Sequence, residues 1–96
     1  MSSLHAFLKK YYNDYNFFHE LFPEALSLLQ KSLLVLDKAV KRGDWNEWCQ
    51  TIKAIQSVSK DMCFKRLIKL KVDPKKPNRK DYYTIMIEVN KIANFQ

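Results

Sequence analysis

Residues 25–44 read ALSLLQKSLLVLDKAVKRGD, and this stretch decides the fold class. Its apolar residues cover about half of a helix circumference. This is typical of a helix that packs against other elements on several sides. Lys41 and Arg42 complement the negative end of the helix dipole. Gly43, the only glycine of the chain, favours the left-handed conformation that ends a helix. Asp44, with Glu47 three residues later, is a capping-box variant and predicts that a new helix begins there.

Upstream, the sequence predicts a separate first helix from about Ser3 to Leu21, capped by Ser2 or Ser3. Its apolar residues, many of them aromatic, recur at helical spacing and form one stripe. They are Leu4, Phe7, Leu8, Tyr11, Tyr15, Phe18 and Phe22. We expect Pro23 to open the second helix, because proline is favoured in the first turn, where its missing N–H would lack a partner anyway.

The helix that begins at Asp44 has an inward stripe that changes phase after residue 63. The first part of the stripe is Trp45, Trp48, Cys49, Ile52, Ile55 and Met62. Phe64, Leu67 and Ile68 then point more than about 100° away, so one straight helix cannot bury both parts. We expect a kink or break near Ser57–Asp61, with Ser59 or Asp61 as a cap. A strand at Ile68–Val72, where apolar and basic residues alternate, is the alternative.

Two prolines in the segment Asp73–Arg79 predict a loop. The last helix should begin near Asn78–Asp81, either of which can cap it. Its stripe is Tyr82, Ile85, Met86, Val89, Ile92 and Ala93. With 47% hydrophobic residues and few glycines, the chain is predicted to be one all-α domain over residues 1–96, a bundle of four or five helices.

The charge of the chain is concentrated in the basic segment, residues 60–80. This segment holds nine basic and two acidic residues, a net charge of +7 that equals that of the whole chain. It is either a surface for an anionic partner or a solvated face of the kind common in small basic proteins. The first interpretation predicts backbone-directed nucleic-acid binding, with Tyr82 and Tyr83 beside Lys80 able to stack on an unpaired base. Its candidate site residues are Lys65, Arg66, Lys69, Lys71, Lys75, Lys76, Arg79, Lys80 and Tyr83.

Several apolar residues lie off the helical stripes and cannot all face one small core. They favour an apolar patch for a partner protein or for a homodimer through Phe17, Leu21, Leu34 and Ile87. Trp45 and Trp48 share a stripe with Ile52 and are expected in the core.

Other classes of function have no support in the sequence. His5 and His19 are too far apart to act together, and Cys49 and Cys63 form no close pair, so no metal or other cofactor is expected. No nucleotide-binding or nucleophile motif occurs, which favours a non-enzymatic protein. No apolar run approaches the roughly 20 residues of a membrane span, and no secretory pattern occurs, so we expect a cytoplasmic protein without a membrane partner.

The stretch Leu21–Trp45, with Ala25, Leu26, Leu29 and Val40 before Gly43 and Asp44, resembles a helical hairpin of flagellar export chaperones. The resemblance implies an adaptor-like bundle. The leading hypothesis is a small non-enzymatic nucleic-acid-binding or accessory protein that contacts phosphates of DNA or RNA through the basic segment. The alternative is a helical interaction module (an adaptor, a chaperone or an inhibitor) that docks on an acidic protein partner.

Overall fold

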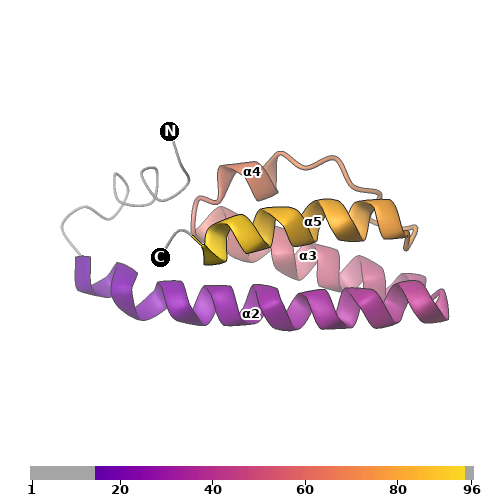
Figure 1. Cartoon of the computed structure of the whole chain (residues 1–96), viewed down its shortest axis with the longest axis horizontal. Coiled ribbons are helices and arrows are strands. Elements are labelled where there is room, and N and C mark those ends of the chain that lie inside the picture. The colour runs from indigo at the N-terminus through magenta and orange to yellow at the C-terminus, as the bar shows by residue number, and fades with distance from the viewer. Residues whose placement is uncertain (1–14, 95–96) are drawn as a thin grey trace.

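A computed structural model describes residues 15–94, with side chains from residue 21 onward, and this range forms four helices (Figure 1). They are α2 (Tyr15–Arg42), α3 (Trp45–Asp61), α4 (Lys65–Ile68) and α5 (Arg79–Ala93). The predicted all-α class is confirmed for these residues. The described part of the chain contains no strand, so the alternative strand at Ile68–Val72 is wrong. The predicted helical stripe of residues 3–14 lies outside the described residues.

Helix α2 runs without interruption through Pro23, so the predicted break before this residue is wrong. The proline ring is exposed, while Phe22 and Ala25 on either side of it are buried in the core. Proline adopts a helical φ and removes only one backbone hydrogen bond, although its ring also crowds the preceding turn. A continuous helix keeps Phe22 and Ala25 on the same buried face, and this packing overrides the local signal.

Two helices end in the same hydrogen-bond pattern, a Schellman motif. At the end of α2, the N–H of Gly43 donates to Val40 O and that of Asp44 to Ala39 O, with Gly43 at φ +67° as predicted. At the end of α3, Cys63 takes the left-handed position at φ +56°, although it is not a glycine. Its N–H donates to Lys60 O, and that of Phe64 donates to Ser59 O.

The end of α3 explains the change of phase that the sequence contains. The helix continues to Asp61, and a short irregular segment then leads to α4. A kink within residues 57–61 stays a prediction. Ser59 and Asp61 do not cap α4: its N-cap is Phe64, and the buried Ser59 hydroxyl donates to Ile55 O at 2.7 Å. The left-handed turn at Cys63 changes the direction of the chain, so that both Phe64 and Leu67 are buried.

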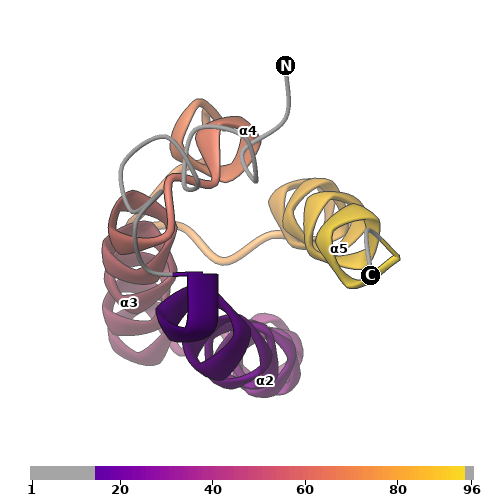
Figure 2. The same ribbon diagram turned by 90° about the vertical axis from the view of Figure 1, so that its left-hand side faces the viewer.

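The core lies among three long helices and is closed by the short one. Helix α2 packs against α3 and α5, and α4 contacts α3 and α5 on the side opposite α2 (Figure 2). The buried apolar residues are Phe22, Ala25, Leu29, Leu33, Leu36, Ala39, Trp48, Ile52, Ile55, Met62, Phe64, Leu67, Ile85 and Val89. Each fully buried large side chain stabilises the fold by about 1.5–3 kcal/mol. No described helix is long and apolar enough to cross a membrane.

The prediction that both tryptophans are in the core is correct for Trp48 and wrong for Trp45. Trp48 is 0% exposed, whereas Trp45 is 62% exposed. Trp45 is the first residue of α3, and it follows the tight turn that ends α2 at Arg42. It therefore lies at the end of the bundle, one turn beyond the layer that covers Trp48, although the two residues share a helical stripe.

Candidate functional site

Seven cations of the basic segment are exposed on consecutive parts of the chain, α4, the loop of residues 69–78 and the first turn of α5. Figure 1 shows that α4 and this loop run along the edge of the bundle away from α2. The structure therefore exposes most of the predicted site residues along these three consecutive parts of the chain. The exposed cations, which we call the basic face, are Lys65, Arg66, Lys69, Lys71, Lys75, Lys76 and Lys80.

The loop of residues 69–78 is fixed near its middle, just before Lys75 and Lys76, by Trp48. The indole Nε1–H of Trp48 donates to Asp73 O at 2.8 Å, which joins the loop to the buried side of α3. The N–H of Lys75 donates to Asp73 Oδ1 at 2.9 Å, so the carboxylate of Asp73 closes a local turn. The two loop lysines thus extend from an ordered backbone, which lowers the entropy lost when they bind a ligand.

The far end of the loop is fixed by reciprocal capping at the start of α5. Asn78 is the N-cap, as predicted, and its Oδ1 accepts from the N–H of Asp81 at 2.8 Å. Asp81 Oδ2 in turn accepts from the side chain of Asn78 and from the N–H of Asp73, both at 2.9 Å. The carboxylates of Asp73 and Asp81 therefore bind backbone and amide donors of the loop, and neither forms an ion pair with a described lysine.

Arg79 is the exception among the predicted phosphate-binding residues, because it already has partners within the fold. Its guanidinium forms an ion pair with Asp37 of α2 and lies over the ring of Tyr82, 5.4 Å from its centroid. Asp37 also pairs with Lys41 at 3.0 Å. The hydrogen bond from Arg79, followed by that from Lys41, holds the pKa of Asp37 below its usual range, and Asp37 raises the pKa of Arg79. Arg79 therefore joins α2 to α5.

Tyr83 presents an exposed ring next to the basic face. It is 51% exposed and lies one turn after Lys80 on α5. Its ring contacts that of Tyr82 edge-on, with centroids 5.4 Å apart and planes at 63°. Tyr82 is half-buried against the core and against Arg79, so it supports the Tyr83 ring from behind.

Trp45 was not predicted as a candidate site residue, because its helical stripe predicts burial. Figure 1 places the start of α3 at the same end of the bundle as the loop that enters α5. The only sequence signal of its exposure is its position directly after the Gly43–Asp44 turn, where a helix has just ended and none covers the next turn.

The four residues proposed for a homodimer have different environments. Leu34 on α2 and Ile87 on α5 are exposed, as expected. Leu21 is half-buried and packs against the core. The side chain of Phe17 lies outside the described residues. The structure therefore leaves Leu34 and Ile87 as exposed members of this set.

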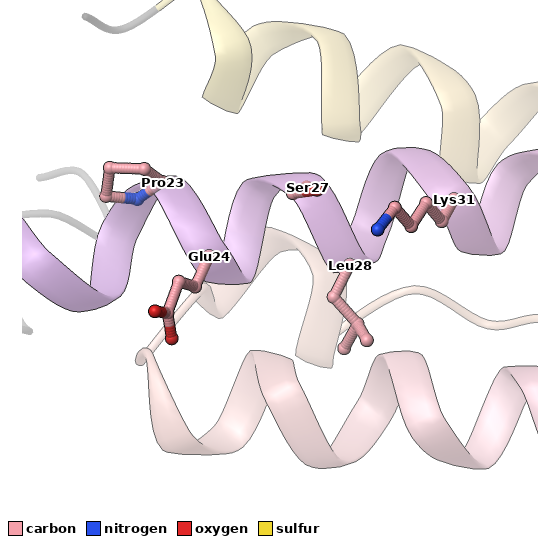
Figure 3. Close-up of a pocket in the computed structure, with 5 residues that line it drawn as sticks. All are labelled: Pro23, Glu24, Ser27, Leu28 and Lys31. Atoms are coloured by element: carbon pink, nitrogen blue, oxygen red, sulfur yellow. The ribbon is translucent and has the colours of Figure 1, made fainter.

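A shallow hollow on α2, lined by Pro23, Glu24, Ser27, Leu28 and Lys31, shows no arrangement for catalysis (Figure 3). All five residues come from one helix, and Leu28 points from it toward α3. None of the five is buried, so no titratable group is enclosed there. Among residues 15–94 no group of three or more His, Cys, Asp and Glu residues could hold a metal ion, and Cys49 and Cys63 are free thiols.

Comparison of the chain with models of known protein families, with curated proteins and with solved structures finds no match.

Proposed function

We propose that the protein is a small, non-enzymatic nucleic-acid-binding or accessory protein of the cytoplasm that contacts the phosphate backbone through the basic face. One observation carries this proposal: seven exposed cations lie along α4, the anchored loop and the first turn of α5, and none forms an ion pair with a residue that the structure describes. Arg79, by contrast, forms an ion pair with Asp37. The seven unpaired cations are free to replace the counterions of a polyanion.

The salt dependence of binding tests the proposal. If five to seven phosphates are contacted, the slope of log K against log salt on duplex DNA should be roughly −4 to −6. Fluorescence anisotropy with a labelled oligonucleotide at salt concentrations between about 50 and 200 mM measures this slope. A slope near zero, or no binding at the lowest salt, would contradict phosphate binding.

A matched pair of triple variants separates the basic face from the total charge of the chain. Lys75→Gln, Lys76→Gln and Lys80→Gln together should make the slope shallower by roughly 3, because three phosphate contacts are lost. The control replaces three exposed lysines of α2 and α3 that lie outside the basic segment, Lys31, Lys38 and Lys53, and so changes the net charge equally. Neither variant should change the melting temperature much, because exposed charges contribute little to stability. Equal loss of affinity in both variants would contradict a localised site.

The alternative, an interaction module for an acidic protein partner, is favoured by the exposed apolar residues Leu34 and Ile87. Tight binding of an acidic protein combined with no binding of oligonucleotides at low salt would support it. A homodimer through the same residues predicts a doubled mass in light scattering, which Leu34→Glu and Ile87→Glu should abolish.

A further inference from the structure

We propose that the ligand of the basic face is a single-stranded nucleic acid whose unpaired bases stack on Trp45 and Tyr83. This inference rests on the proposed function and specifies its substrate class. It starts from two aromatic side chains that the core does not use, 62% and 51% exposed. Buried rings stabilise a fold, whereas rings that stay in water beside a cationic surface are the groups on which unpaired bases stack.

The loop that carries Lys75 and Lys76 is held to α3 by one contact and leads directly into α5. The hydrogen bond from Trp48 Nε1 to Asp73 O holds the middle of the loop against α3. Trp45 lies three residues before Trp48, about 4.5 Å further along the helix axis toward the end of the bundle. The loop then passes through Lys75 and Lys76 and enters α5 at Asn78. Figure 1 shows the start of α3 and the start of α5 at this same end.

The second ring is positioned by the contacts at the start of α5. The ion pair between Arg79 and Asp37 fixes the first turn of α5 against α2, and Arg79 lies over the ring of Tyr82. Tyr82 contacts Tyr83 edge-on, which restricts the Tyr83 side chain while leaving its ring half-exposed. A ring that is already held in place loses less entropy when a base stacks on it. Arg79 thus acts in this proposal as a positioning residue for Tyr83.

Both rings belong to helices that begin at the end of the bundle where the loop enters α5: Trp45 is the first residue of α3, and Tyr83 follows Lys80 by one turn on α5. A single strand presents partners for the lysines and for the rings, phosphates along its backbone and bases free to leave the strand. In a duplex the bases are stacked inside the helix, so Trp45 and Tyr83 have no partner and only the lysines contribute. The surface should therefore prefer a single strand to a duplex.

The test compares three labelled ligands of about 12 nucleotides, a length within the range that small single-strand-binding modules cover. They are oligo(dT), an abasic strand with the same phosphates, and a duplex. The full-length protein is used as wild type and as Trp45→Leu, Tyr83→Leu and the double variant. Leu34→Ala is the matched control, because Leu34 is also exposed but lies on α2.

The wild type should bind oligo(dT) more tightly than the abasic strand and the duplex. Each ring removed should weaken oligo(dT) binding roughly 5- to 150-fold, which corresponds to one stacked base. The same variants should bind the abasic strand like the wild type, and Leu34→Ala should bind all three ligands unchanged. Oligo(dT) should also quench tryptophan fluorescence in the wild type and not in Trp45→Leu, because Trp48 is 0% exposed.

Equal affinity of the wild type for oligo(dT) and the abasic strand, or unchanged oligo(dT) binding by the double variant, would overturn the inference. If binding nevertheless falls steeply with salt, phosphate binding stands and only base stacking fails. If the wild type binds none of the three ligands at low salt, both proposals fail. Circular dichroism melts of the variants identify any loss of affinity that comes from unfolding.

Discussion

Trp48→Phe should destabilise the fold and release the basic loop, since Trp48 combines complete burial with the hydrogen bond that anchors the loop. Its indole N–H donates to Asp73 O at 2.8 Å, and its side chain is 0% exposed. Loss of one such hydrogen bond costs about 1 kcal/mol. Loss of two buried ring carbons costs about 1.5 kcal/mol more, at about 0.8 kcal/mol for each buried carbon group. A total of about 2.5 kcal/mol should lower the melting temperature of a domain of this size by about 10–20 °C.

Trp45→Phe is the matched control for this prediction, because it makes the same chemical change in a side chain that is 62% exposed. It should change the free energy of unfolding by less than about 0.5 kcal/mol. Thermal and urea unfolding followed by circular dichroism measure both variants, and amide hydrogen exchange of residues 73–78 should become faster only in Trp48→Phe. Equal stability of the two variants, or unchanged exchange in the loop, would refute the anchoring role of Trp48.

Two further predictions concern the helix ends and the ion pair of Asp37. Gly43→Ala should destabilise the protein by about 1 kcal/mol through its left-handed backbone alone, since no atom lies within 4 Å of an added Cβ. The Cys63→Gly variant should be more stable than Cys63→Ala by a similar amount, because Cys63 has the same left-handed backbone. Urea unfolding measures all three variants. Equal stability of Cys63→Gly and Cys63→Ala would contradict backbone strain at Cys63. The pKa of Asp37 is lowered in the folded state, so at this group the folded state binds fewer protons than the unfolded chain. The stability that Asp37 contributes is therefore lost as the pH falls through its pKa in the folded state. The difference in melting temperature between the wild type and Asp37→Asn should therefore shrink between about pH 5 and pH 2, and a difference independent of pH would exclude this ion pair as its source.

Local signals in the sequence predicted the helix boundaries where one residue alone sets the backbone. Gly43 ends α2 in the left-handed conformation, Asp44 accepts a hydrogen bond from the N–H of Glu47 at 3.1 Å, and Asn78 caps α5. The same rules failed at Pro23, where a continuous buried face stabilises the helix through the proline. They also did not predict the left-handed conformation of Cys63, because cysteine has no preference for it. The burial of Phe64 and Leu67 beyond the turn favours this conformation.

The candidate site was predictable in part for a similar reason. Exposure of lysine follows from the cost of burying its charge, so the cations of the basic segment could be placed at the surface from the sequence alone. The partner of Arg79 could not be predicted, because Asp37 is 42 residues away in the chain. Trp45 was assigned to the core because helical periodicity specifies a face and not whether a neighbour covers that face.

By itself, the sequence determined the helical class, the turn at Gly43, the start of α5 and the concentration of positive charge in residues 60–80, because each depends on residues close together in the chain. Only the tertiary structure decided which cations of that segment form an ion pair with another described residue and which do not. Packing of α5 against α2 brings Arg79 to Asp37, and packing of the loop against α3 buries Trp48 and leaves Trp45 in water. These outcomes depend on contacts between distant segments, whose free energies no local pattern contains.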